Sequence, residues 1–245
     1  MIRTIFGVLF AVVYLIIGIP VLFIEWIIGK INKHAMDISS LRLVQWAFRV
    51  IAKICGIKLT VLGQENLPKD QPVLYIGNHR SYFDIILSYS LCPDLTGYIA
   101  KDTLEKVPLL NIWMKRLYCL FMNRDDMKQS LKTILKGAEY VKQGVSICIF
   151  PEGTRNKGKE TELLPFKEGS FKIAEKTGCP VIPMAISNSA AVIADHPPKV
   201  TPCHIIIEYG QPIYPKELPK EERKKLGSIT QQVIQEMLIK NETLI

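Results

Sequence analysis

Beyond Gly56 the chain alternates short apolar runs with stretches of helical periodicity, and this alternation limits the fold more than any other feature. Short runs that are apolar throughout are typical of strands buried on both faces, and parallel strands need a crossover between them. The predicted strands are Lys58–Leu62, Val73–Ile76, Gly97–Ala100, Leu117–Met122, Ser146–Phe150, Val181–Ile186 and His204–Tyr209. The predicted helices are Tyr82–Leu91, Leu110–Lys115, Met127–Gln143, Glu168–Lys176 and Lys220–Lys240. We therefore expect an α/β domain over residues 56–245, with a single, mostly parallel mixed sheet flanked by helices.

Residues 1–55 have a different character and are predicted to form membrane-anchoring helices. The 21 residues from Thr4 to Ile24 contain no charge. As a helix they measure about 31 Å, which matches a hydrocarbon core of about 30 Å. Gly18 and Pro20 interrupt the run, so a transmembrane helix and a bent hairpin held in one leaflet both remain open. A cleaved signal peptide is not expected, because the stretch is too long and no small-x-small site follows it.

The segment Ser39–Cys55 is predicted to be a basic amphipathic helix, capped by Ser39 or Ser40 and ended by Gly56. Its basic stripe consists of Arg42, Arg49 and Lys53, opposite a wide apolar face. The stripe is either the solvated side of a helix packed on the core or a contact with an anionic membrane surface. Lysine and arginine are concentrated after the apolar run, which predicts a cell-membrane protein with its main domain on the cytoplasmic side.

The net charge of +8 implies an anionic partner, which composition alone leaves as nucleic acid, a membrane surface or a phosphorylated substrate. The six cysteines lie at least 24 residues apart and form no Cys-x-x-Cys pair. We expect them to be reduced, mostly buried thiols in the cytosol, with no structural metal site. Neither a P-loop nor a dinucleotide-binding glycine motif occurs.

Polar residues follow the predicted strand Val73–Ile76 in the segment Asn78–Asp84. A histidine at the carboxyl end of such a strand lies where open α/β sheets bind ligands. His79 and Asp84 can meet only if His79 lies in the loop and Asp84 in the first helical turn. Ser81 and Asp84 also have the spacing of a capping box, which would account for Asp84 without catalysis.

A second polar segment, Phe150–Arg155, follows the predicted strand that begins at Ser146. Gly153 permits a close backbone approach, and Arg155 offers a planar fork for phosphate. An ordinary Pro-Glu-Gly turn is the alternative interpretation. Further cations follow other strands or lie nearby, namely Lys101, Arg124, Lys157, Lys159 and Lys167. Together they predict a site for a phosphate dianion.

Four ordered segments resemble the motif blocks of the glycerolipid acyltransferases, and most closely those of the lysophosphatidate acyltransferases. They are Asn-His-x-x-x-x-Asp at 78–84 (the HX4D motif), Phe-x-x-Arg at 121–124, Phe-Pro-Glu-Gly-Thr-Arg at 150–155 and Val-Ile-Pro at 181–183. The linking residues 164–169 also fit the family's pattern. Asn123 departs from it, because an acidic residue is common there.

The resemblance implies direct transfer of a fatty acyl group from a thioester to the sn-2 hydroxyl of lysophosphatidate, which makes phosphatidic acid. His79 would be the general base, and Asp84 would orient it. The phosphate and glycerol would be bound by Lys101, Arg124, Glu152, Gly153, Thr154 and Arg155, with Asn78 and Pro183 in the site wall. Amides at the start of the following helix are expected as oxyanion donors. No metal or cofactor is expected beyond acyl-ACP or acyl-CoA as co-substrate, and no nucleic acid as partner.

Four alternatives remain open at this level. The acceptor is lysophosphatidate, glycerol 3-phosphate or another lysophospholipid. A serine hydrolase would have to use Ser146, in the poorly matching segment 144–148. A two-step transferase would have to use a cysteine such as Cys119 or Cys148. A membrane-anchored basic module would have no catalytic role at all.

Overall fold

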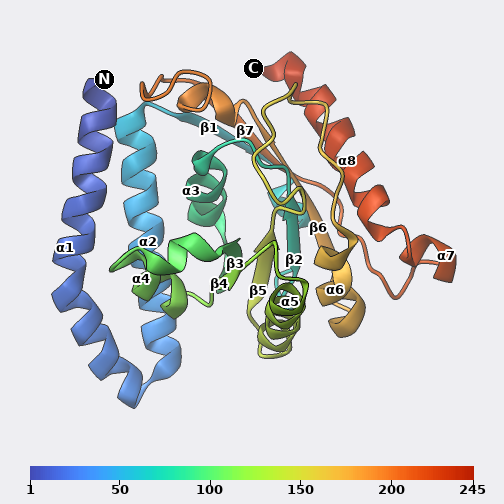
Figure 1. Cartoon of the computed structure of the whole chain (residues 1–245), viewed down its shortest axis with the longest axis horizontal. Coiled ribbons are helices and arrows are strands. Elements are labelled where there is room, and N and C mark those ends of the chain that lie inside the picture. Colours follow the sequence, from blue (N-terminus) through green and yellow to red (C-terminus); the bar gives the residue numbers. More distant parts are fainter.

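A computed structural model describes residues 1–245, and its core is one seven-stranded sheet in the order β1-β7-β6-β2-β5-β3-β4 (Figure 1). The strands are β1 (Lys58–Leu62), β2 (Leu74–Gly77), β3 (Thr96–Lys101), β4 (Leu120–Met122), β5 (Ser146–Ile149), β6 (Val181–Ser187) and β7 (His204–Tyr209). All neighbouring pairs are parallel except β6 with β7. The predicted mostly parallel mixed sheet is therefore confirmed.

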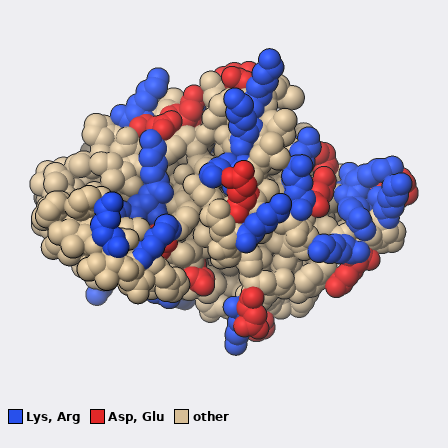
Figure 2. Space-filling model, turned by 90° about the horizontal axis from the view of Figure 1, so that it is seen from below, with Lys and Arg blue, Asp and Glu red and all other residues tan.

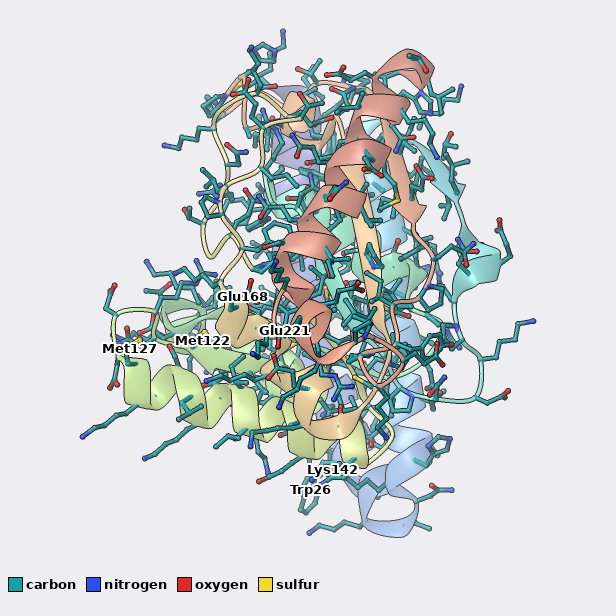
Figure 3. The ribbon with its side chains drawn as sticks, turned by 90° about the vertical axis from the view of Figure 1, so that its right-hand side faces the viewer. Trp26, Met122, Met127, Lys142, Glu168 and Glu221 are labelled. Atoms are coloured by element: carbon teal, nitrogen blue, oxygen red, sulfur yellow. The ribbon has the colours of Figure 1, made fainter.

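Helices cover both faces of the sheet. The helices are α1 (Ile2–Ile31), α2 (Lys33–Cys55), α3 (Tyr82–Leu91), α4 (Leu110–Arg116), α5 (Met127–Lys142), α6 (Lys172–Thr177), α7 (Lys220–Arg223) and α8 (Leu226–Asn241). In one core cluster, helices α1, α2, α3 and α4 pack against one face of the sheet. In the other, α5, α6 and α8 pack against the opposite face. Figure 3 shows α8 across this second face and α5 running sideways from Met127 to Lys142.

Element boundaries differ from the prediction where local geometry intervenes. β4 begins at Leu120 rather than Leu117, because Tyr118 has a φ of 59°, which no strand residue adopts. The predicted helix Glu168–Lys176 consists of a 3-10 turn, Glu168–Phe171, followed by α6. The predicted helix Lys220–Lys240 is divided into α7 and α8.

The two N-terminal helices form an antiparallel hairpin whose turn is at Asn32 (Figure 1). α1 continues through Gly18 and Pro20 as one helix, so the chain does not turn back at these residues. α2 begins at Lys33 because the Asn32 side chain accepts a hydrogen bond from the amide of Ala35 at 3.0 Å. The predicted serine cap was wrong.

The serines instead join the two helices of the hairpin. Ser39 Oγ donates to Glu25 Oε1 at 2.6 Å, and Ser40 Oγ donates to Glu25 Oε2 at 3.4 Å. Glu25 is only 2% exposed although it lies in the apolar helix. A buried carboxylate needs such donors, because leaving it without a hydrogen-bond partner lowers the folding stability by about 1–3 kcal/mol or more.

The outer side of α1 is apolar and has no partner. The most apolar 18-residue window of α1 has a mean hydropathy of 2.8, and the helix is long enough to cross a membrane. Its exposed stripe comprises Ile5, Leu9, Val12, Ile16, Ile19, Phe23 and Ile27, all at least 44% exposed. Figure 2 shows that the corresponding side of the molecule, at the left, is largely free of charge. An exposed apolar surface of this length is typical of membrane association.

Both halves of α1 are also attached to the α/β domain. Near its start, Thr4 Oγ1 donates to the carbonyl of Pro198 at 3.0 Å and accepts from the amide of Val200 at 3.0 Å. Further along, Arg116 Nη2 donates to the carbonyl of Leu22 at 3.3 Å. α1 therefore lies along the domain rather than extending away from it.

Candidate functional site

The site begins where β2 passes into α3. Ser81 is the N-cap of α3, and its Oγ accepts from the amide of Phe83 at 3.3 Å. In return Asp84 Oδ2 accepts from the amide of Ser81 at 2.7 Å. The capping box expected from the Ser81 and Asp84 spacing is therefore present.

The same carboxylate also holds His79. Asp84 Oδ2 lies 2.7 Å from His79 Nδ1 and accepts from the amide of Arg80 at 2.7 Å. The Asp84 side chain is 0% exposed, whereas that of His79 is 12% exposed. Capping and histidine orientation are thus compatible, because one oxygen atom performs both. With Nδ1 bound to Asp84, Nε2 is the nitrogen left to face a substrate.

The His79 ring and backbone are fixed by residues of the segment after β5. The ring stacks on Phe150, with centroids 4.5 Å apart and planes 20° from parallel. The amide of His79 donates to Glu152 Oε1 at 2.8 Å, and its carbonyl accepts from the amide of Asn156 at 2.7 Å. The two polar segments found in the sequence therefore form one unit.

The buried carboxylate of Glu152 holds the two polar segments together through backbone hydrogen bonds. Its second oxygen, Oε2, accepts from the amide of Leu164 at 3.1 Å, and the residue is 4% exposed. Burial raises the pKa of the Glu152 carboxyl, although the two amide donors act in the opposite direction. Because both oxygens are occupied by backbone amides, the structure places Glu152 behind His79 rather than at a ligand surface.

Of the two residues expected in the site wall, Asn78 directly follows β2 and Pro183 lies within β6. Asn78 Nδ2 donates to the carbonyl of Ile186 at 2.9 Å, and its Oδ1 accepts from the amide of Ile186 at 2.8 Å. Pro183 pairs with Ile76 in the sheet and lies against Gly210, which also contacts Met237 of α8. Asn78 therefore fastens the end of β2 to β6, and Pro183 is on the α8 side.

Two cations contact Gly153, and two more lie at the carboxyl ends of neighbouring strands or in the same segment. Arg124 Nη1 donates to the carbonyl of Gly153, and Lys167 lies so close that a Cβ on Gly153 would be 2.9 Å from its Nζ. Arg155 is two residues away, and Lys101 ends β3 opposite Met122. Gly153 has a φ of 73°, a conformation that glycine adopts without strain.

None of these four cations makes a salt bridge, so their charge is available to an anion. Burial lowers the pKa of Arg124, and the nearby Asp102 acts against this shift. Thr154 is exposed beside them. The expected cations therefore lie at the carboxyl edge of the parallel strands, where an anionic ligand would meet charge-assisted donors.

The contacts between Arg80 and residues 158–160 were not predicted from the sequence. Arg80 Nη1 donates to the carbonyl of Gly158 at 2.6 Å, and its Nε lies 3.7 Å from Glu160. Glu160 accepts from the amide of Asn188, and burial raises the pKa of its carboxyl. Residues 156–160 are thereby tied both to the histidine loop and to the end of β6.

Three of the amides expected as oxyanion donors already have acceptors. Those of Arg80 and Ser81 donate to Asp84, and that of Phe83 donates to Ser81 Oγ. These amides form the helix cap that positions Asp84. They could donate to an oxyanion only if the hydrogen bonds of the cap were broken. This expectation was therefore wrong for these three amides.

The three alternative nucleophiles, one serine and two cysteines, are unsuitable in the structure. Ser146 is buried at the start of β5, and its Oγ accepts from the amide of Val73 at 3.1 Å. Burial raises the pKa of the Cys119 thiol to about 12 and that of Cys148 well above its ordinary value. Thiols of this kind stay protonated at neutral pH and are poor nucleophiles.

The fold and site define a class of enzyme. An imidazole held by a buried carboxylate can take a proton from a hydroxyl, and the adjacent cations can bind an anionic part of the same substrate. A family model described as Acyltransferase matches residues 58–187, which include all these groups. The chain belongs to this acyltransferase family.

Relatives with assigned names agree with one another. A "1-acyl-sn-glycerol-3-phosphate acyltransferase" of Saccharomyces cerevisiae is 30% identical over 207 residues, covering 82% of this chain and 67% of that protein. A protein of the same name from Borreliella burgdorferi is 38% identical over 138 residues, covering 56% of this chain and 54% of its own length. Several relatives therefore extend well beyond the matched segment.

A solved structure resembles the whole chain. The crystal structure of the 1-acyl-sn-glycerophosphate (LPA) acyltransferase PlsC from Thermotoga maritima superposes with a TM-score of 0.85 at 26% sequence identity. The match covers 98% of this chain and 95% of that chain. It thus includes the helical hairpin as well as the α/β domain.

Proposed function

We propose that this chain transfers a fatty acyl group from an acyl thioester to the sn-2 hydroxyl of 1-acyl-sn-glycerol 3-phosphate, making phosphatidic acid. The observation that carries the proposal is His79, held through Nδ1 by the buried Asp84, at the same carboxyl edge of the sheet as four cations that form no salt bridge. The names of the relatives and of the similar structure support this acceptor.

In the proposed reaction His79 Nε2 takes the proton of the sn-2 hydroxyl as its oxygen attacks the thioester carbonyl. A C–O bond forms, and the carbonyl becomes a tetrahedral oxyanion. When the C–S bond breaks, the imidazolium returns its proton to the leaving thiolate, which departs as a thiol. Asp84 keeps the ring oriented and stabilises the imidazolium that forms between these steps.

The cations would hold the acceptor during this exchange. Lys101, Arg124, Arg155 and Lys167 would bind the phosphate dianion, leaving the hydroxyl near Nε2. Glu152 and Asn156 would act indirectly by holding the His79 backbone. Either acyl-ACP or acyl-CoA would supply the thioester, with no metal or other cofactor.

The proposed location is the cytoplasmic face of the cell membrane. The apolar stripe of α1 would enter one leaflet, because attachments at both halves of α1 hold it along the domain. The basic stripe of Arg42, Arg49 and Lys53 is exposed on α2 and would face anionic headgroups. Such placement would bring the site to an acceptor that resides in the membrane.

The test is acyl transfer by the purified protein, with acyl-ACP and acyl-CoA as donors. The acceptors are 1-acyl-sn-glycerol 3-phosphate, glycerol 3-phosphate and a lysophospholipid with a larger headgroup. We expect the first acceptor to give the highest kcat/KM, and His79→Ala to abolish transfer without unfolding the protein. Near-normal turnover by His79→Ala would refute the mechanism, and preference for another acceptor would refute the proposed substrate.

A further inference from the structure

Arg155 and Tyr82 belong to different polar segments and meet in the folded chain. The guanidinium carbon of Arg155 lies 4.3 Å from the centroid of the Tyr82 ring. Tyr82 is the first residue of α3 and is 57% exposed, whereas the next two residues, Phe83 and Asp84, are buried. The Tyr82 ring is therefore turned outward, toward Arg155 rather than the core.

This contact places the guanidinium over the Tyr82 ring and engages none of its N–H groups in a hydrogen bond to the protein. The Arg155 side chain has no hydrogen bond or salt bridge within the protein, so its N–H groups remain available. An aromatic ring attracts a cation through its negatively charged face, while carboxylates and phosphates bind the guanidinium in its plane. Stacking on Tyr82 thus restricts a long, exposed side chain without competing for the donors that would bind an anion.

The position of Tyr82 links the anion site to the catalytic pair. The capping box that directs Asp84 toward His79 also fixes the backbone at Tyr82. On the other side, Glu152 and Gly153 precede Arg155, and Glu152 is bonded to the His79 backbone. The ring under Arg155 is therefore joined through the backbone to the segment that carries the base.

We propose that Tyr82 is a positioning residue for phosphate recognition, which orients Arg155 and so favours acceptors that carry a phosphate monoester. The inference rests on the proposed function and adds a determinant of acceptor selectivity to it. Tyr82 does not take part in proton transfer, so its effect belongs to acceptor binding.

The test compares Tyr82→Leu with the unaltered protein. We expect KM for 1-acyl-sn-glycerol 3-phosphate to rise about two- to fivefold, as for loss of an exposed cation–π contact, with little change in kcat. KM for the thioester should not change. With 1-acylglycerol, which lacks the phosphate, Tyr82→Leu should have no effect on kcat/KM.

Two control variants separate stacking from general packing. Tyr82→Phe keeps the aromatic ring, and its acceptor KM should equal that of the unaltered protein. Tyr140→Leu removes a partly buried ring on α5, where Lys136 lies 5.2 Å from the centroid, and should not change the acceptor KM. In an Arg155→Ala background, Tyr82→Leu should add no further increase. An equal effect on the neutral acceptor, or an undiminished effect without Arg155, would overturn the inference.

A binding measurement makes failure of the inference distinct from failure of the proposed function. Calorimetric titration with sn-glycerol 3-phosphate should show weaker binding for Tyr82→Leu and unchanged binding for Tyr82→Phe. If Tyr82→Leu weakens binding but the unaltered protein transfers no acyl group, the anion site stands and the proposed reaction fails. If transfer occurs and Tyr82→Leu changes neither KM nor binding, the role of Tyr82 is refuted.

Discussion

Asp84 shows how one side chain connects local folding to catalysis. Its Oδ2 accepts from two backbone amides at the start of α3 and from His79 Nδ1, all at 2.7 Å. Because the helix cap and the histidine share an atom, the start of the helix determines where the imidazole points. Substitutions at this position can therefore separate the structural contribution from the chemical one.

Asp84→Asn should retain most of the stability but lose most of the activity. Its carboxamide oxygen can still accept from the backbone, but it carries no charge to stabilise the imidazolium. We expect kcat to fall about 10²- to 10⁴-fold, the range of general base catalysis. Asp84→Ala should additionally lose about 1 kcal/mol of capping stability. Kinetics and thermal unfolding of both variants test this, and a normal kcat for Asp84→Asn would contradict it.

Glu152→Gln should destabilise the protein by about 1–3 kcal/mol, because its NH2 group must face one of two amide donors. Displacement of the His79 backbone should also lower kcat. Chemical denaturation and steady-state kinetics measure the two effects. Unchanged stability and turnover would show that these hydrogen bonds are dispensable.

The same variant carries a pH prediction. The folded pKa of Glu152 is raised above its ordinary 4.5, so the folded protein binds this proton more tightly than the unfolded chain. The resulting stabilisation is fully present below pH 4.5 and is lost as pH rises through the folded pKa. The stability advantage of the unaltered protein over Glu152→Gln should therefore shrink across that interval and then level off. An advantage that grows with pH would contradict the assigned shift.

At the scale of elements, α1 has two different sides. Gly18, Leu22 and Glu25 are buried against the molecule, while the apolar stripe from Ile5 to Ile27 is exposed. Insertion of that stripe into a membrane would remove its apolar area from water, which is favourable. The inner side belongs to the protein core, and the outer side is free for lipid.

Replacing Ile16 and Phe23 with lysine should weaken membrane binding without disrupting the fold. Both side chains are more than half exposed, at 55% and 62%, so their replacement leaves no cavity. We expect sedimentation with anionic vesicles to fall at least tenfold, while the thermal unfolding temperature in detergent stays within about 3 °C. The matched control is Lys128→Ala together with Lys132→Ala on α5, two exposed residues outside the hairpin. Equal vesicle binding by all proteins would refute membrane attachment through this stripe.

At the scale of the whole molecule, the hairpin and the α/β domain share one core. The cluster that contains Leu22 and Leu41 also includes Phe83, Trp113 and Ile205. α1 is attached near both of its halves, so crossing a bilayer would require breaking these contacts. This geometry favours a protein that lies on one side of the membrane.

Both chain ends should therefore be accessible from the same side. Epitope tags at the N- and C-termini are expected to be digested together by protease added to inside-out membrane vesicles. Both should be protected in right-side-out vesicles. Protection of the N-terminal tag alone in inside-out vesicles would show that α1 spans the bilayer.

The sequence by itself determined the features that depend on neighbours along the chain. The bounds of β1, β7 and α3 match the prediction, because apolar periodicity and capping are local properties. The Ser81 and Asp84 spacing likewise predicted the capping box at the start of α3. Boundaries were wrong where a distant or unusual partner intervened, as at Asn32, where Ser39 and Ser40 bond to Glu25 instead of capping.

Only the tertiary structure decided which side chain meets which partner across the sheet. The strand order β2-β5-β3-β4 brings four loops together, and no spacing within one loop reveals the contacts between them. Glu152 thus binds the His79 backbone rather than facing a ligand, Pro183 lies toward α8, and Arg155 rests on Tyr82. The physical reason is that burial and hydrogen bonding are set by groups far apart in the chain, which meet only after the sheet has formed.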